Sequence, residues 1–182
     1  DFDGRLLWKA MDPQYPADTR YGATSSVLIH KNQAIIVQER EKNTKRRTWL
    51  AAFDIPSGEV LWRVNPIHLQ RGYTTGLLHD DGTGMKLMIA SFQKILCFEL
   101  EAGRLLWKHA IPMEQIVASL TRADSLFCVG GGTWGPKGLI AFTLADGDKR
   151  SPVEELWRAS EDTPGCASPV IYNGIVFSIT DT

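Results

Sequence analysis

One short phrase recurs four times along the chain and limits what it can fold into. Roughly every 50 residues, a leucine precedes a tryptophan that is followed by lysine or arginine. Such a period indicates repeated supersecondary units, each needing a neighbour to cover its apolar face. An indole buries a large area and its N–H needs a partner, so we expect each tryptophan to pack between neighbouring units. The four tryptophans are Trp8, Trp62, Trp107 and Trp157.

Two further spacings align the units with one another. In three units an aromatic residue lies five positions before a glycine, as Phe53 does before Gly58. In three places a tryptophan lies four positions after a glycine. A tight turn between antiparallel strands often requires positive φ, which glycine adopts without steric cost, so we expect structural turn glycines here. The repeated turn glycines are Gly58, Gly103 and Gly147.

The unit that begins near Ser25 shows the composition of one repeat most clearly. It contains four short runs of strand-forming residues, separated by polar residues, glycine or proline. Such runs indicate four antiparallel strands, A to D in chain order. The runs are Ser26–Ile29, Ala34–Val37, Trp49–Phe53 and Glu59–Arg63.

Repeated four-stranded units of this length predict an all-β fold, a β-propeller of four-stranded antiparallel blades. Residues 1–182 then hold three full blades and two partial ones, a fragment of a seven- or eight-bladed propeller whose remaining blades are missing. The full blades are expected at about 24–64, 74–110 and 117–159, and the partial ones at 1–10 and 167–182.

Composition excludes some classes of function. The chain is 43% hydrophobic and 23% charged, as in ordinary globular domains. A net charge of −1 argues against a nucleic-acid partner, which would require a basic surplus. No apolar run approaches the roughly 18 residues of a transmembrane segment. The cysteines Cys97, Cys128 and Cys166 lack metal-ligand spacing, so we interpret them as inert residues of the core.

The aromatic–Gly–Leu-Trp pattern resembles the repeat of the pyrroloquinoline-quinone (PQQ)-like, or quinoprotein-like, propellers. The best matching stretches are Ala52–Trp62 and Cys97–Trp107, and Ala167–Phe177 is similar to the family's passage from strand A to strand B. The family includes quinone-dependent dehydrogenases, outer-membrane assembly lipoproteins and many bacterial extracytoplasmic proteins. The resemblance implies a bacterial protein of the periplasm or cell surface. Because all members share this packing repeat, it does not choose among their functions.

The connections from strand D to A and from B to C share one face of such a propeller. This face, here called the long-loop face, carries the longest loops and is the candidate binding face. Within it, Gly130–Pro136 is the most distinctive loop: its glycines allow close approach of a ligand and Trp134 offers a stacking surface, or the loop is a wide turn with one aromatic residue. The candidate binding residues are Arg20, Tyr21, His68, Arg71, Tyr73, Trp134 and Lys137.

These patterns favour a non-enzymatic scaffold without a cofactor, which binds a protein, peptide or glycan. The resemblance to the PQQ-like propellers implies that it does so outside the cytoplasm. The alternative is a fragment of a dehydrogenase that uses PQQ and calcium to oxidise an alcohol or sugar. No catalytic or metal-ligating residue is assigned, because adjacent cysteines are absent and no carboxylate matches the roles that a dehydrogenase requires. The Asp80–Gly84 segment is interpreted as a hairpin turn rather than a calcium loop. A sensor domain fused to another module is a third possibility.

Overall fold

The recurring turn signals separate fourteen β-strands in the computed structural model, which describes residues 3–10, 24–38, 48–65, 69–70, 72–145 and 152–180. Twelve of the strands form three four-stranded antiparallel sheets, each in chain order, and the last two form a hairpin. This is the partial propeller that the sequence predicts. In the described part of the chain no helix is long and apolar enough to cross a membrane.

Each sheet is one blade. The first comprises β1 (Leu28–His30), β2 (Gln33–Gln38), β3 (Trp49–Asp54) and β4 (Val60–Val64). The second comprises β5 (Leu77–Asp80), β6 (Met85–Ser91), β7 (Lys94–Glu99) and β8 (Leu105–Ala110). The third comprises β9 (Thr121–Ala123), β10 (Leu126–Gly131), β11 (Gly138–Leu144) and β12 (Val153–Ala159), and the hairpin comprises β13 (Val170–Tyr172) and β14 (Ile175–Phe177).

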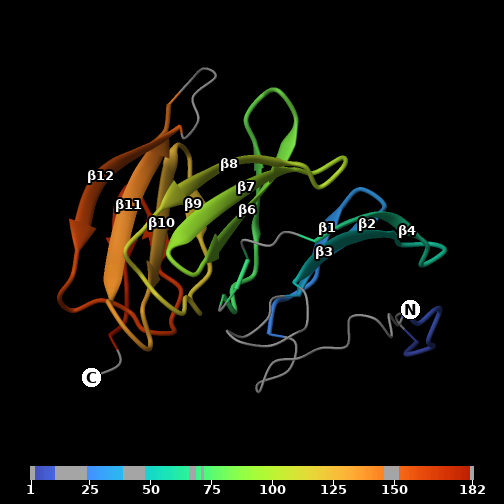
Figure 1. The fold of residues 1–182 in the computed structure, drawn as a ribbon, viewed down its shortest axis with the longest axis horizontal. Helices are drawn as coiled ribbons and strands as arrows, with labels where there is room; N and C mark the ends of the chain where they lie inside the picture. The colour runs from blue at the N-terminus through green and yellow to red at the C-terminus, as the bar shows by residue number, and fades with distance from the viewer. Residues whose placement is uncertain are drawn as a thin grey trace.

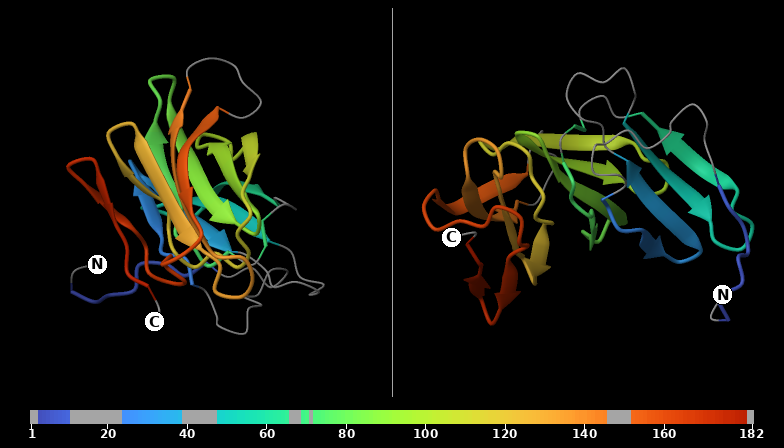
Figure 2. Two further views of the ribbon diagram at one scale, coloured as in Figure 1. Left: turned by 90° about the vertical axis from the view of Figure 1, so that its left-hand side faces the viewer. Right: turned by 90° about the horizontal axis from the view of Figure 1, so that it is seen from below.

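The blades lie side by side in chain order, and their facing sides form the core (Figures 1 and 2). One apolar cluster, with Leu50 and Phe98 fully buried, fills the space between the first and second blades. A second cluster, with Met88 and Phe142, fills the space between the second and third. The hairpin β13–β14 follows the third blade, next to β9. Burial of apolar area between successive sheets is what joins the repeats.

The repeat tryptophans lie at these junctions. Trp8 stacks near Phe53 and its indole N–H donates to the carbonyl oxygen of Ile55, at 2.6 Å. A Cβ atom on Gly58 would lie 2.6 Å from the Trp8 ring. The ring contact recurs one blade on, where a Cβ atom on Gly103 would lie 2.6 Å from the Trp62 ring, but within the described residues the buried indole nitrogen of Trp62 has no hydrogen-bond partner. Trp8 and Trp62 therefore each cover the turn glycine of the following blade, which has room for the ring because it has no side chain.

A series of hydrogen bonds links the segments that lie just before the first strand of each blade, here called the inner strand. The backbone N–H of Ser26 donates to Thr75 Oγ1 at 2.9 Å, and that of Thr75 donates to Ser119 Oγ at 3.0 Å. The N–H of Ser119 in turn donates to Ser168 Oγ at 2.9 Å. One hydroxyl per blade thus accepts from the equivalent residue of the preceding blade. This serine/threonine repeat was not predicted from the sequence, although its three steps of 49, 44 and 49 residues follow the same period as the tryptophans.

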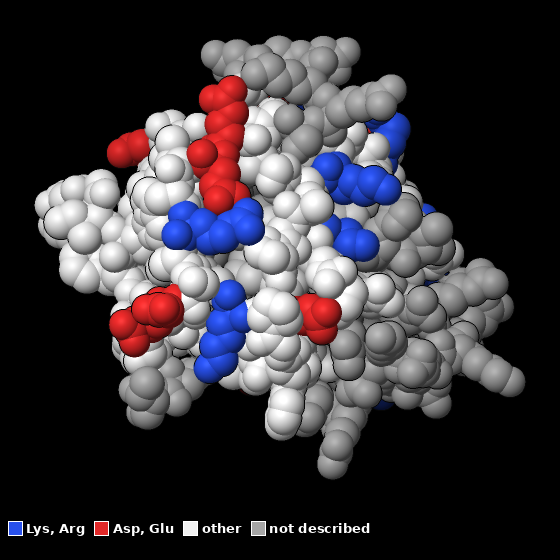
Figure 3. All heavy atoms as spheres, turned by 60° about the vertical axis from the view of Figure 1, so that its left-hand side comes forward, with Lys and Arg blue, Asp and Glu red and all other residues white. Residues whose placement is uncertain are grey.

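Figure 3 shows one face of the molecule, with lysine, arginine and acidic side chains interspersed over its described residues. The visible charges do not gather into a basic patch. Mixed charge of this kind agrees with the net charge of −1 for the whole chain.

Candidate functional site

The structure places three of the predicted binding residues, and all three lie on the long-loop face. Tyr73 lies in the connection from β4 to β5, and its backbone N–H donates to the carbonyl oxygen of Ile116 at 2.8 Å. Trp134 and Lys137 lie in the connection from β10 to β11, and both are exposed. The predicted residues Arg20, Tyr21, His68 and Arg71, and the turn glycine Gly147, lie outside the described residues.

The loop that carries Trp134 is held by neighbouring segments. The Thr133 hydroxyl donates to the carbonyl oxygen of Gly165 at 3.1 Å, from the connection that follows the third blade. Gly135 has a φ of 126° and lies against Glu114, whose carboxylate accepts from Gln93 Nε2 at 3.1 Å. Positive φ at this position favours glycine. The Trp134 side chain itself is 68% exposed, so a fixed backbone presents a free indole.

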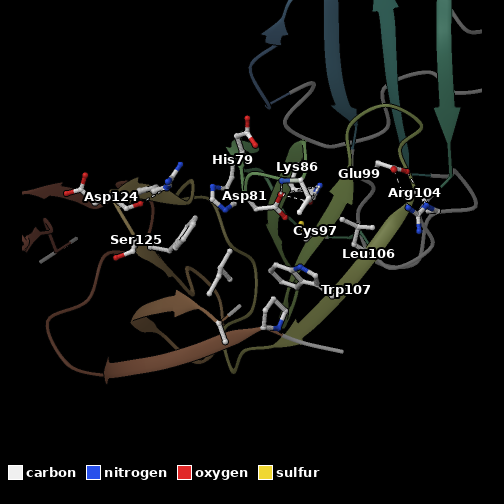
Figure 4. Close-up of a pocket in the computed structure, with 17 residues that line it drawn as sticks. His79, Asp81, Lys86, Cys97, Glu99, Arg104, Leu106, Trp107, Asp124 and Ser125 are labelled. Carbon is white, nitrogen blue, oxygen red and sulfur yellow. Dashed lines mark hydrogen bonds and ion pairs between the residues drawn. The ribbon is translucent and has the colours of Figure 1, made fainter. Parts of the chain in front are cut away.

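A cavity of about 950 Å³ lies on the opposite face, between the second and third blades (Figure 4). The turns between strands A and B and between C and D lie on this side, here called the glycine-turn face. No residue of this face was predicted from the sequence to bind a ligand. The cavity's rim is polar and its floor is apolar, and the lining residues are His79, Asp80, Asp81, Thr83, Lys86, Cys97, Glu99, Arg104, Leu106, Trp107, Arg122, Asp124, Ser125, Phe127, Leu144, Ala145 and Pro152.

The register of the second blade explains why the rim is polar. His79, Lys86 and Glu99 are direct cross-strand partners on β5, β6 and β7, and therefore lie in one row on one face of the sheet. The next row inward begins with Met88 and Cys97, which belong to the core between the blades. The polar row thus covers the outer edge of an apolar junction.

Two ion pairs neutralise most of the charge at the rim. Lys86 Nζ lies 3.5 Å from Asp81 Oδ1, and Arg104 Nε lies 3.1 Å from Glu99 Oε2. Burial alone would raise the pKa of Asp81, but hydrogen bonds from Thr83 and the charge of Lys86 outweigh it and lower the pKa. The hydrogen bond from Arg104 lowers the pKa of Glu99. Both carboxylates are therefore ionised and engaged near neutral pH.

Three further side chains meet at the third-blade wall of the cavity. The Arg122 guanidinium lies over the Phe127 ring, with its carbon 5.6 Å from the ring centroid. The edge of the His79 ring meets the same phenyl group, with centroids 5.2 Å apart. Burial lowers the pKa of His79, and the nearby Arg122 charge lowers it further. His79 is therefore neutral at pH 7, since its ordinary pKa is already below that value.

The two buried cysteines, Cys97 and Cys128, are not reactive thiols. Burial raises the pKa of Cys97 to about 12, and that of Cys128 also to about 12. Thiols with such values stay protonated and unreactive at neutral pH. These two cysteines behave as small core residues, whereas Cys166 is exposed, unlike the sequence-based expectation.

A calcium-dependent quinone dehydrogenase requires a cluster of side chains that hold the metal ion. In the part of the chain that the structure describes, no three His, Cys, Asp or Glu side chains gather closely enough to hold a metal ion. None of the described residues is assigned to a metal, a quinone or a catalytic step.

Comparison with known proteins extends the resemblance that the repeat suggests. A protein of the mouse, Mus musculus, named FAM234B is 30% identical over 110 residues, which cover 56% of this chain and 16% of that protein. The likeness is therefore not confined to bacterial proteins. The chain spans only a small part of this relative's length, so the match concerns one segment of a longer protein.

Two solved structures share the fold. BamB from Moraxella catarrhalis superposes with a TM-score of 0.55 at 16% identity, over 84% of this chain and 42% of that one. A quinohemoprotein alcohol dehydrogenase from Comamonas testosteroni gives 0.54 at 12% identity, over 79% of this chain and 21% of that one. Identities this low show a common architecture and leave the function open.

The sequence itself matches a family model over more than half of its length. The model is described as outer membrane protein assembly factor BamB, and it matches residues 46–181. This range includes three of the four repeat tryptophans and all three turn glycines. The chain belongs to the PQQ-like repeat β-propeller family that this model represents.

Proposed function

We propose that the chain is a non-enzymatic scaffold without a cofactor, which binds a protein or peptide partner through its long-loop face outside the cytoplasm. One observation carries this proposal: the 68% exposed indole of Trp134 on a loop whose backbone is held in place. Tryptophan is among the residues that most often dominate binding energy at protein interfaces. The family's printed description, a protein assembly factor, supports a partner that is itself a protein.

The bracing of the loop matters because binding orders flexible groups at a free-energy cost. Thr133 is bonded to the neighbouring connection, and Gly132 has a φ of 106° with the backbone of Pro136 against it. A Cβ atom at Gly132 would lie 2.3 Å from the Pro136 carbonyl oxygen. Contacts such as the Thr133 hydrogen bond reduce the number of conformations open to the loop, which lowers the entropy that it loses when a partner binds.

Selection of peptides from a random library displayed on phage, with the immobilised 182-residue chain as the target, tests the proposal. We expect enriched peptides to bind the unaltered chain and to lose about tenfold or more in affinity for the variant Trp134→Ala, since truncation of such an anchor typically costs about 2 kcal/mol. Fluorescence polarisation of a labelled peptide measures the two dissociation constants.

Tyr172→Ala is the matched control, because Tyr172 is 66% exposed but lies on β13. This variant is expected to bind the same peptides with unchanged affinity. Equal loss in both variants, or loss in Tyr172→Ala alone, would refute a site centred on Trp134. Failure to enrich any peptide, together with Trp134-dependent binding to a glycan array, would replace the peptide partner by a carbohydrate.

A further inference from the structure

The cavity on the glycine-turn face contains charged groups that already satisfy one another. Lys86 contacts Asp81 and also donates to Thr83 Oγ1 at 3.1 Å. Arg104 donates to both carboxylate oxygens of Glu99, at 3.1 and 3.2 Å. These two cations have carboxylate partners and offer little attraction to an incoming anion.

Arg122 differs from these two cations. Its Nε–H donates to the backbone carbonyl oxygen of Asp124 at 2.6 Å, which fixes the guanidinium above Phe127. Among the residues that the structure describes, no carboxylate pairs with its two terminal nitrogens. A guanidinium presents these nitrogens as a planar fork that matches a carboxylate.

His79 supplies a second unsatisfied group in the same wall. Its side chain is only 9% exposed, and within the described residues its Nδ1 atom is buried without a hydrogen-bond partner. An unsatisfied buried polar atom is costly, and such atoms in native proteins call for an explanation. His79 and Arg122 flank the same phenyl ring of Phe127, so one ligand group can lie between them.

The cavity floor provides the complementary apolar surface. Trp107 and Leu106 line it from β8, and Leu144 and Pro152 line it from the third blade. Figure 4 shows Trp107 below the polar row that includes Lys86 and Glu99. A partly enclosed apolar floor with a few polar groups at its margin is the usual form of a small-molecule site.

We propose that this cavity binds a small amphipathic carboxylate, whose carboxylate lies between Arg122 and His79 and whose apolar body covers Trp107 and Leu144. A singly charged, planar group suits the site better than a phosphate does. Asp80, Asp81 and Asp124 line the same cavity, and their negative charges disfavour a doubly charged anion. This site lies on the face opposite Trp134 and does not depend on the partner proposed there.

Three probes of similar shape test the proposal on the 182-residue chain: 3-phenylpropionate, the uncharged 3-phenylpropionamide and the cation 3-phenylpropylamine. We expect the carboxylate to bind with a dissociation constant in the millimolar range, as suits a small fragment, and the other two at least about tenfold more weakly. Titrations followed by NMR chemical shifts measure all three constants.

Two arginine variants identify the cation that binds the probe carboxylate. Arg122→Gln is expected to remove the preference for the carboxylate, because a charge-assisted hydrogen bond contributes about a factor of ten or more. Arg158→Gln is the matched control: Arg158 is also a strand arginine that donates through Nε, but it pairs with Glu155 on β12 and does not line the cavity. It should retain the full preference. Both arginines are exposed, so neither substitution is expected to unfold the chain.

The pH dependence gives an independent readout. Arg122 and Lys86 lower the pKa of His79, whereas Asp81 and Asp80 raise it, and burial lowers it most. An anion beside the ring favours the imidazolium and raises this pKa in the complex. The probe carboxylate should therefore bind more tightly as the pH falls from about 7 to about 5.5. In His79→Gln this pH dependence should vanish.

The proposal is overturned by any of four results. These are absence of carboxylate binding, equal binding of the amide, stronger binding of the amine, and an unchanged preference in Arg122→Gln. The last result would assign the anion to a different cation on the chain.

Discussion

At the scale of single residues, Trp62 and Gly103 show how two blades are held together. Gly103 has a φ of 66° in the turn between β7 and β8, and a Cβ atom there would lie 2.6 Å from the Trp62 ring. Two independent constraints therefore act on one residue: a left-handed backbone conformation and close contact with an aromatic ring. Either constraint alone would favour glycine.

These two constraints can be separated by mutation. Gly103→Ala is expected to lower the free energy of unfolding by about 3 kcal/mol, the sum of the backbone strain and the displacement of Trp62. Gly82→Ala is the control, because Gly82 has a φ of 85° but nothing lies within 4 Å of its added Cβ. It should cost only about 1 kcal/mol, from the backbone. Urea unfolding of the two variants measures the difference, and equal losses would show that the ring contact contributes nothing.

The sequence predicts the tryptophans and the turn glycines, but not which of them meet. Gly4 lies four positions before Trp8, yet the Trp8 ring covers Gly58 of the next blade. The reason is that a side chain on the last strand of a blade points across the junction, so its partner is a full repeat away. The pair of Arg122 and His79 was missed because the two residues come from different blades and share no motif.

At the scale of elements, the inner strands are joined by hydroxyl groups as well as by apolar packing. Ser119 both accepts from the N–H of Thr75 and donates its own N–H to Ser168. It therefore connects three successive units. Bonds of this kind fix how far one blade can slide along the next, which packing of apolar side chains alone does not determine.

Ser119→Ala tests this connection. The variant leaves the Thr75 N–H without its acceptor, and we expect a loss of about 1 kcal/mol in the free energy of unfolding. Hydrogen exchange at the Thr75 amide should accelerate in the same variant, because its protection depends on that bond. Ser178→Ala, on an exposed segment after β14, should change neither quantity. An unchanged Thr75 exchange rate would contradict the proposed linkage.

The strands themselves follow directly from the sequence, because short apolar runs alternate with turn residues. All four runs of the first repeat overlap observed strands, β1 to β4, although β1 begins at Leu28, two residues after the start of the predicted run. The cavity could not be predicted in this way. It depends on how side-chain rows of two blades face each other, next to a connection after Leu144 that is longer than its equivalents.

At the scale of the whole molecule, both ends of the row of blades expose apolar side chains. Leu6 and Ile29 lie exposed at one end, and Val170, Tyr172 and Phe177 at the other. In each junction between described blades, the equivalent faces are covered by the next sheet. The expectation of a bacterial source stays a prediction, and the mouse relative shows that similar segments occur elsewhere.

The two candidate surfaces lie on opposite faces, and their roles can be separated. The long-loop face exposes Trp134, the proposed anchor for a large partner, whereas the glycine-turn face contains a partly open cavity, the proposed site for a small molecule. A change at one face leaves the contacts of the other intact. Peptide binding and carboxylate binding are therefore expected to be independent.

Mapping a selected peptide onto the isotopically labelled chain by amide chemical shifts tests most directly whether the chain binds its partner through the long-loop face. We expect the largest shifts in residues 130–138 and in the neighbouring connection at 163–168, with the indole N–H of Trp134 among them. The cavity residues His79 and Arg122 should not change. Shifts concentrated in the cavity or along β13 and β14, with the Trp134 loop unaffected, would contradict a scaffold that binds through its long-loop face.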